Sequence, residues 1–93
     1  MIEEREGVTV NDHDDSIEID LKRPLHMNGE ELLSISLRRP TVDDLERMDK
    51  AQGAMSKGIM ISSYLSGLPP KTIRQMDAAD FKVISEVIAD FLE

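Results

Sequence analysis

Carboxylates and histidines are the side chains in this sequence that could do chemistry, and the carboxylates gather in three groups. The densest group is Asp12-His13-Asp14-Asp15, whose oxygens could bind a hard cation. No further ligand cage or glycine turn follows it, so we interpret this group as a solvated acidic segment. The second histidine, His26, is too distant in sequence from His13 to form a zinc pair on one helix. The sequence therefore predicts no metal and no cofactor.

The other two groups are the carboxylate pairs Asp43-Asp44 and Asp77/Asp80. Paired carboxylates can act as general acid and base. Both pairs, however, stand at the start of a predicted helix, where a side chain can cap free amides and negative charge is favoured. The hydroxyl of Thr41, for example, can accept from the amide of Asp44. We therefore favour capping over acid–base chemistry for both pairs.

Nucleophilic catalysis has no support in the sequence. Ser62, Ser63 and Ser66 have no histidine at a matching spacing, and the chain of 93 residues has no cysteine. No glycine-rich loop is suited to cradle a phosphate. We therefore predict that the protein is not an enzyme.

The net charge of −8 is concentrated at the start of the chain, where the first twenty residues carry eight acids and one base. No cluster of Lys and Arg is present, so nucleic-acid binding is not predicted. We predict an acidic flexible tail over residues 1–15 and a single α+β domain over residues 16–93. Val8 and Val10 alternate with polar residues and could instead form a short edge strand. No signal peptide or membrane span is recognisable, so we expect a soluble intracellular protein.

A β-hairpin is predicted over residues 16–38, followed by a helical part over 41–93. The first strand alternates through Ile17, Ile19 and Leu21, and we expect Pro24 to close it. Asn28-Gly29 is a turn signal, because both residues tolerate positive φ. The second strand alternates through Leu33, Ile35 and Leu37, so the hairpin has one apolar face that helices must cover.

Three helices are expected over about 42–52, 54–66 and 77–92, with a helical turn near 71–76. The first carries Val42, Leu45 and Met48 at helical spacing. Gly53 weakens any continuation into the second helix, and Gly67 is placed to end that helix. The last helix repeats Phe81, Ile84, Ile88 and Phe91 at intervals of three and four.

The apolar stripe over residues 55–61 has two interpretations. It either packs against the hairpin as core, which we favour because a small chain needs its apolar surface for itself, or forms a groove for a partner helix. If a partner binds, the candidate residues are Met55, Ile59, Met60, Tyr64 and Leu68. Methionine side chains suit such a surface because they adapt to different partners.

The order of these features resembles the phage tail assembly chaperones, the family of small tail proteins of P2-like and Mu-like phages. The resemblance rests on the first strand with Arg23-Pro24, on Asn28-Gly29-Glu30, on the segment 37–41 with Asp44-Leu45, and on Tyr64–Pro70. It continues through Ile73, Met76-Asp77, Asp80-Phe81 and Phe91-Leu92, so that it covers roughly residues 17–92.

The resemblance implies a non-enzymatic role: binding the tape measure protein, a long helical protein that aggregates before tube subunits cover it. It also implies action in the host cytoplasm, absence from the mature virion and, in many members, a longer form made by frameshifting. Two alternatives are a structural tail or baseplate component and a small acidic regulatory binding protein.

Overall fold

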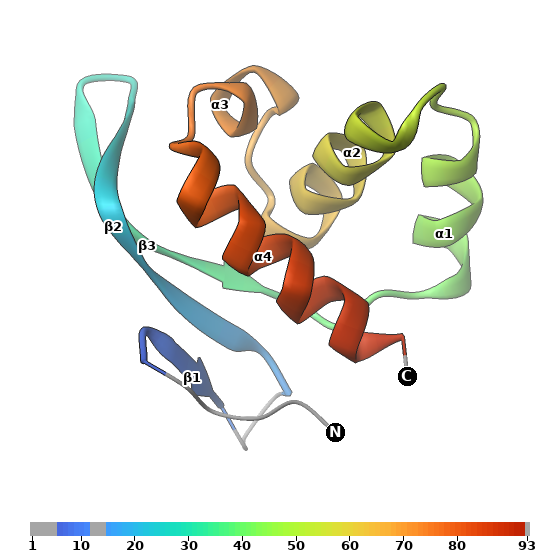
Figure 1. Cartoon of the computed structure of the whole chain (residues 1–93), viewed down its shortest axis with the longest axis horizontal. Helices are drawn as coiled ribbons and strands as arrows, with labels where there is room; N and C mark the ends of the chain where they lie inside the picture. The colour runs from blue at the N-terminus through green and yellow to red at the C-terminus, as the bar shows by residue number, and fades with distance from the viewer. Residues whose placement is uncertain (1–5, 12–14, 93) are drawn as a thin grey trace.

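The computed structural model describes residues 6–11 and 15–92 of the chain. Within these residues a three-stranded antiparallel sheet of order β1-β2-β3 is followed by four helices, which lie on one side of the sheet (Figure 1). The elements are β1 (Val8–Val10), β2 (Ile17–Met27), β3 (Glu30–Leu37), α1 (Val42–Asp49), α2 (Ala54–Ser66), α3 (Pro70–Arg74) and α4 (Ala78–Phe91). This architecture confirms the predicted α+β fold.

The predicted hairpin is formed by β2 and β3. Ile17 lies opposite Leu37 and Ile19 opposite Ile35, so the apolar residues of the two strands share a face. The connecting residue Asn28 has φ 52° and Gly29 has φ 78°, as a type I′ turn requires. The turn signal in the sequence was therefore correct.

Two details of the hairpin differ from the prediction. Pro24 does not close the first strand, because β2 continues to Met27 past an irregularity between Asp20 and Leu25. Asp20 pairs with Ser34 and Leu25 pairs with Leu32. Strand β2 therefore has more residues than β3 between these two pairs. Proline is tolerated there because the regular ladder of amide hydrogen bonds is interrupted.

Near the start of β3, the same irregularity changes which side chains point towards the core. Leu32 packs against the core, whereas Leu33 is 61% exposed, contrary to the predicted alternation through Leu33, Ile35 and Leu37. A shift of one residue in a strand moves its side chains to the opposite face. The alternation therefore holds only for Ile35 and Leu37, on the regular side of the irregularity.

Strand β1 lies within residues 1–15, the segment for which we predicted a flexible tail. Val8 pairs with Ile19, and Val8 is 3% exposed, so residues 8–10 belong to the sheet as the alternative interpretation proposed. Residues 1–5 and 12–14 of the predicted tail lie outside the described residues.

The helices cover the apolar face of the sheet. The side chains with less than 2% exposure come from both layers: Ile17, Ile19, Leu37, Ile73, Ile84, Val87 and Ser62. α4 packs on β2 and α2 packs on β3, whereas α1 packs chiefly on α2 and lies furthest from β1 in the view of Figure 1. The sheet, α2, α3 and α4 thus supply most of the core, and α1 packs at its edge through the partly buried Met48.

The helix boundaries are close to those predicted. α1 ends at Asp49, earlier than residue 52, and Val42 is 82% exposed instead of contributing to a buried stripe. α2 matches the prediction and is followed by Gly67 with φ 77°. α3 begins at Pro70, since a proline at the first helical position needs no amide partner.

Candidate partner-binding site

An apolar groove lies between α2, α3 and the start of α4, with a volume of about 290 Å³. We call it the α2–α4 groove, and its lining residues are Met55, Ile59, Ile73, Arg74, Met76, Ala78 and Phe81. Met55 is 66% exposed at one wall, whereas Ile73 and Met76 are buried. The groove is therefore a concave surface of aliphatic, thioether and aromatic groups with one cation, Arg74.

Close packing between Gly58 and Phe81 holds the two long walls together. A Cβ atom at position 58 would lie 3.3 Å from Cζ of Phe81, tighter than an ordinary contact. Gly58 weakens α2 as a helix, but it allows the ring of Phe81 to approach the α2 backbone. The sequence did not reveal this pairing, because the two residues belong to separate helices.

The five candidate residues proposed from the sequence do not form one surface. Met55 and Ile59 line the α2–α4 groove, one helical turn apart on α2. Met60 and Tyr64 are half-buried on another side of α2, where the guanidinium of Arg47 lies 5.8 Å from the centroid of the Tyr64 ring. Leu68 is partly buried against the core, and its carbonyl accepts from the hydroxyl of Ser63. The other groove residues come from α3, from α4 and from the connection between them, and none of them was among the candidates proposed from the sequence.

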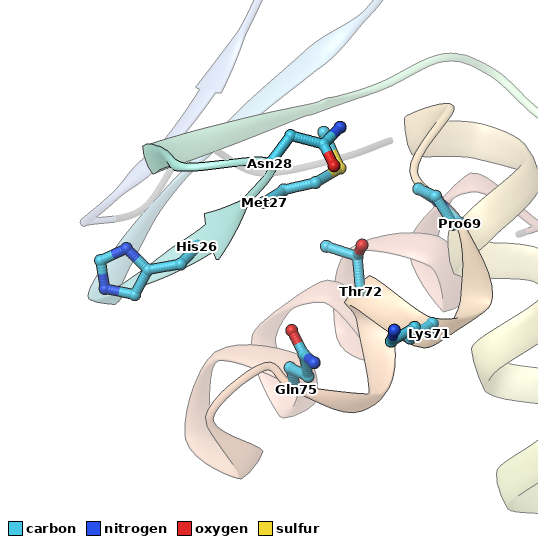
Figure 2. Close-up of a pocket in the computed structure, with 7 residues that line it drawn as sticks. All are labelled: His26, Met27, Asn28, Pro69, Lys71, Thr72 and Gln75. Atoms are coloured by element: carbon cyan, nitrogen blue, oxygen red, sulfur yellow. The ribbon is translucent and has the colours of Figure 1, made fainter.

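A second cleft of about 290 Å³ separates the hairpin turn from α3 (Figure 2); most of the residues that line it are polar, and we call it the polar cleft. Met27 and Asn28 line it from the hairpin, and Lys71, Thr72 and Gln75 line it from α3. The imidazole of His26 points away from α3 in this view, so these polar groups do not converge on one point (Figure 2). The cleft therefore lacks the arrangement of a catalytic or metal site.

Metal ligation has no candidate among the described residues, which contain no group of three or more His, Cys, Asp or Glu placed to hold an ion. Asp12, His13 and Asp14 of the acidic segment lie outside the described residues. In the same part of the chain no helix is long and apolar enough to cross a membrane. Among the carboxylates that the structure describes, Asp44 and Asp80 are buried, each 3% exposed.

Asp44 caps its own helix, as predicted. Its amide donates to the Thr41 hydroxyl over 3.3 Å, and its carboxylate accepts from the Thr41 amide over 2.8 Å, which completes a capping box. Arg38 donates two further hydrogen bonds to this carboxylate, at 2.6 and 2.8 Å. The hydrogen bonds from Arg38 hold the pKa of Asp44 well below its usual range, against the opposing effect of burial. Asp44 is therefore a structural anion, not a general acid.

Asp80 is used differently from the capping role that we predicted for its pair. Asp77 caps α4 by accepting from the amide of Ala79 over 3.1 Å. The two oxygens of Asp80 instead accept from the amides of Lys22 and Arg23, at 3.0 and 3.1 Å. These amides lie in the irregular part of β2, so Asp80 satisfies donors that the sheet leaves free.

The buried carboxylates Asp44 and Asp80 are thus committed to holding the fold. A model of a protein family, described as "Phage tail assembly chaperone proteins, E, or 41 or 14", matches residues 18–93. This chain belongs to the phage tail assembly chaperone family. The match confirms the family resemblance drawn from the sequence, and this family is one of assembly factors and not of enzymes. No curated protein and no solved structure matches the chain.

Proposed function

We propose that this tail assembly chaperone binds the tape measure protein and keeps it soluble in the host cytoplasm until tail tube subunits cover it. The family match over residues 18–93 is the observation that carries the proposal. A holding role also agrees with a surface in which Met55 is 66% exposed beside an apolar groove. Methionine side chains adapt to partners of varied shape, as successive segments of a long helical protein would require.

Co-expression with the tape measure protein of the same genome tests this function. The soluble fraction of the tape measure protein should rise several-fold over expression with an unrelated small acidic protein, and the two chains should co-purify. A tape measure protein that is equally soluble alone and never co-purifies would contradict the proposal.

Mass spectrometry of purified virions separates a chaperone from a structural subunit. Under the proposal the chain is absent from mature particles, whereas a tail or baseplate component would be present in a fixed ratio to other tail proteins. Peptides beyond residue 93, found in infected cells, would reveal the longer frameshifted form that the family resemblance implies.

A further inference from the structure

Among the residues that the structure describes, the one charged side chain that lines the α2–α4 groove, Arg74, is opposite in sign to the net charge of the chain. Arg74 lines the groove, and Lys82 follows Ala78 by one turn on α4 and is exposed. The acid nearest to Arg74 in sequence is Asp77, whose carboxylate lies 3.5 Å from the guanidinium of Arg23 and accepts from the Ala79 amide. No carboxylate of residues 6–11 or 15–92 forms an ion pair with Arg74 among the contacts found there. In a protein of net charge −8, this groove is lined by the cation Arg74, which forms no ion pair with a carboxylate of the described residues.

The dimensions of the groove suit side chains and not a whole peptide strand. Its volume of about 290 Å³ is nearly twice that of the roughly 150 Å³ cavity that accommodates benzene, so one or two large apolar side chains fill it. Its walls are helices, which offer no free strand edge to pair with an extended peptide. A partner must satisfy its own backbone hydrogen bonds when it binds there, which a helix does.

We propose that the α2–α4 groove receives apolar anchor side chains from an amphipathic helix of the partner, and that Arg74 selects helices with a carboxylate beside those anchors. The inference rests on the proposed function, in which the partner is the helical tape measure protein. It adds which segments of that partner are held: those whose apolar stripe is flanked by Glu or Asp.

Two synthetic helical peptides test the selection. Both carry the same apolar stripe of Leu and Phe, but one has Glu and the other Lys at the flanking positions. The affinity for the Glu peptide, measured by fluorescence anisotropy, should exceed that for the Lys peptide by about three- to five-fold, the range of a partly exposed ion pair. Equal affinities, or preference for the Lys peptide, would overturn the role of Arg74.

The methionines report where the peptide binds. In protein labelled with ¹³C at the methionine methyl groups, the Glu peptide should shift the signals of Met55 and Met76, which line the groove. The signal of Met27, which lines the polar cleft, and that of Met48 on α1 should stay in place. Shifts confined to Met27 or Met48 would show that the groove is not the binding site.

Arg74 has a matched control on the same short helix. Lys71 is also exposed but lines the polar cleft behind the hairpin turn (Figure 2). Arg74→Glu should abolish or reverse the preference for the Glu peptide, and Lys71→Glu should leave it unchanged, with circular dichroism confirming that both variants fold. Equal effects of the two substitutions would mean that only net charge matters.

The tape measure protein separates failure of this inference from failure of the proposed function. If the wild-type chain and Met55→Ser with Arg74→Glu both retain the tape measure protein equally, the function stands and the groove is wrong. If the peptides behave as expected but the tape measure protein never co-purifies, the groove binds a different acidic helix and the proposed function fails.

Discussion

Helices α1 and α4 both carry an aspartate in their first turn, but the two carboxylates bind different kinds of partner. Each helix has an aspartate at its third residue, Asp44 and Asp80, and each is 3% exposed. Asp44 interacts with residues no more than six positions away, Thr41 and Arg38. Asp80 reaches the amides of Lys22 and Arg23, 58 and 57 positions away in the chain. One carboxylate completes a local helix start, and the other joins a helix to a strand.

Because of this difference, α1 and α4 have different roles in the fold. Asp80 supplies an acceptor to an irregular strand that packs against α4, so it fixes α4 on the sheet and with it the Phe81 wall of the α2–α4 groove. Asp44 fixes only α1 relative to the end of β3, through Arg38, and α1 does not line the groove. Disturbing Asp80 should therefore affect both folding and the groove, whereas disturbing Asp44 should affect folding alone.

The largest effect is expected for Asp80→Ala. Loss of its carboxylate leaves two partly buried amides without an acceptor, and we expect the free energy of unfolding to fall by about 3 kcal/mol. Urea denaturation followed by circular dichroism measures this. Asp77→Ala, which removes a helix cap and an exposed ion pair with Arg23, is the matched control and should cost about 1 kcal/mol. Equal costs for the two substitutions would contradict the role assigned to Asp80.

A smaller, pH-dependent effect is expected for Asp44→Asn. The pKa of Asp44 is lowered in the folded state, so its stabilising contribution is fully present above the unfolded pKa of about 3.9 and is lost as the pH falls towards the lower, folded value. At neutral pH the substitution should cost about 2 kcal/mol, because charge-assisted hydrogen bonds are lost.

Denaturation curves at pH 7, 4 and 2.5 check the sign of this effect. The wild-type chain should lose more stability than Asp44→Asn between pH 4 and 2.5, so that the two curves converge in acid. Parallel curves would show that Asp44 titrates normally.

The smallest effect is expected at the neighbouring Asp43, which forms an exposed ion pair with Arg47 at 3.0 Å. Exposed pairs one helical turn apart contribute about 0.3–0.5 kcal/mol, so Asp43→Asn should be nearly neutral. Added salt at 0.5 M should remove even this difference. A cost as large as that of Asp44→Asn would mean that charge near the helix end, and not the hydrogen-bond geometry, stabilises α1.

Local features of the chain were predictable because their physical causes are local. The alternation of Ile17 and Ile19, the Asn28-Gly29 turn and the Gly67 helix end depend on the conformations of neighbouring residues, and all three are present. The family was also recognisable, since the order of these signals is a property of the sequence. The hydrogen bond from the Asp44 amide to the Thr41 hydroxyl belongs to the same class of prediction.

Features that depend on tertiary contacts could not be predicted from the sequence. Leu33 faces outward because of an irregularity in the opposite strand, and Phe81 lines a groove because Gly58, on another helix, leaves room for its ring. The candidate residues on α2 meet different elements in the folded chain: Met55 and Ile59 line the groove with α3 and α4, whereas Tyr64 lies beside Arg47 of α1.

The sequence alone determined where carboxylates stand at helix starts, since an aspartate near free amides is favoured wherever a helix begins. Only the tertiary structure decided which of them stays local. Arg38 lies six positions from Asp44 and can reach it across the turn into α1, whereas the amides of Lys22 and Arg23 reach Asp80 only after α4 has packed on β2. The apolar groove follows from the same packing, because its walls come from helices that meet only in the folded chain.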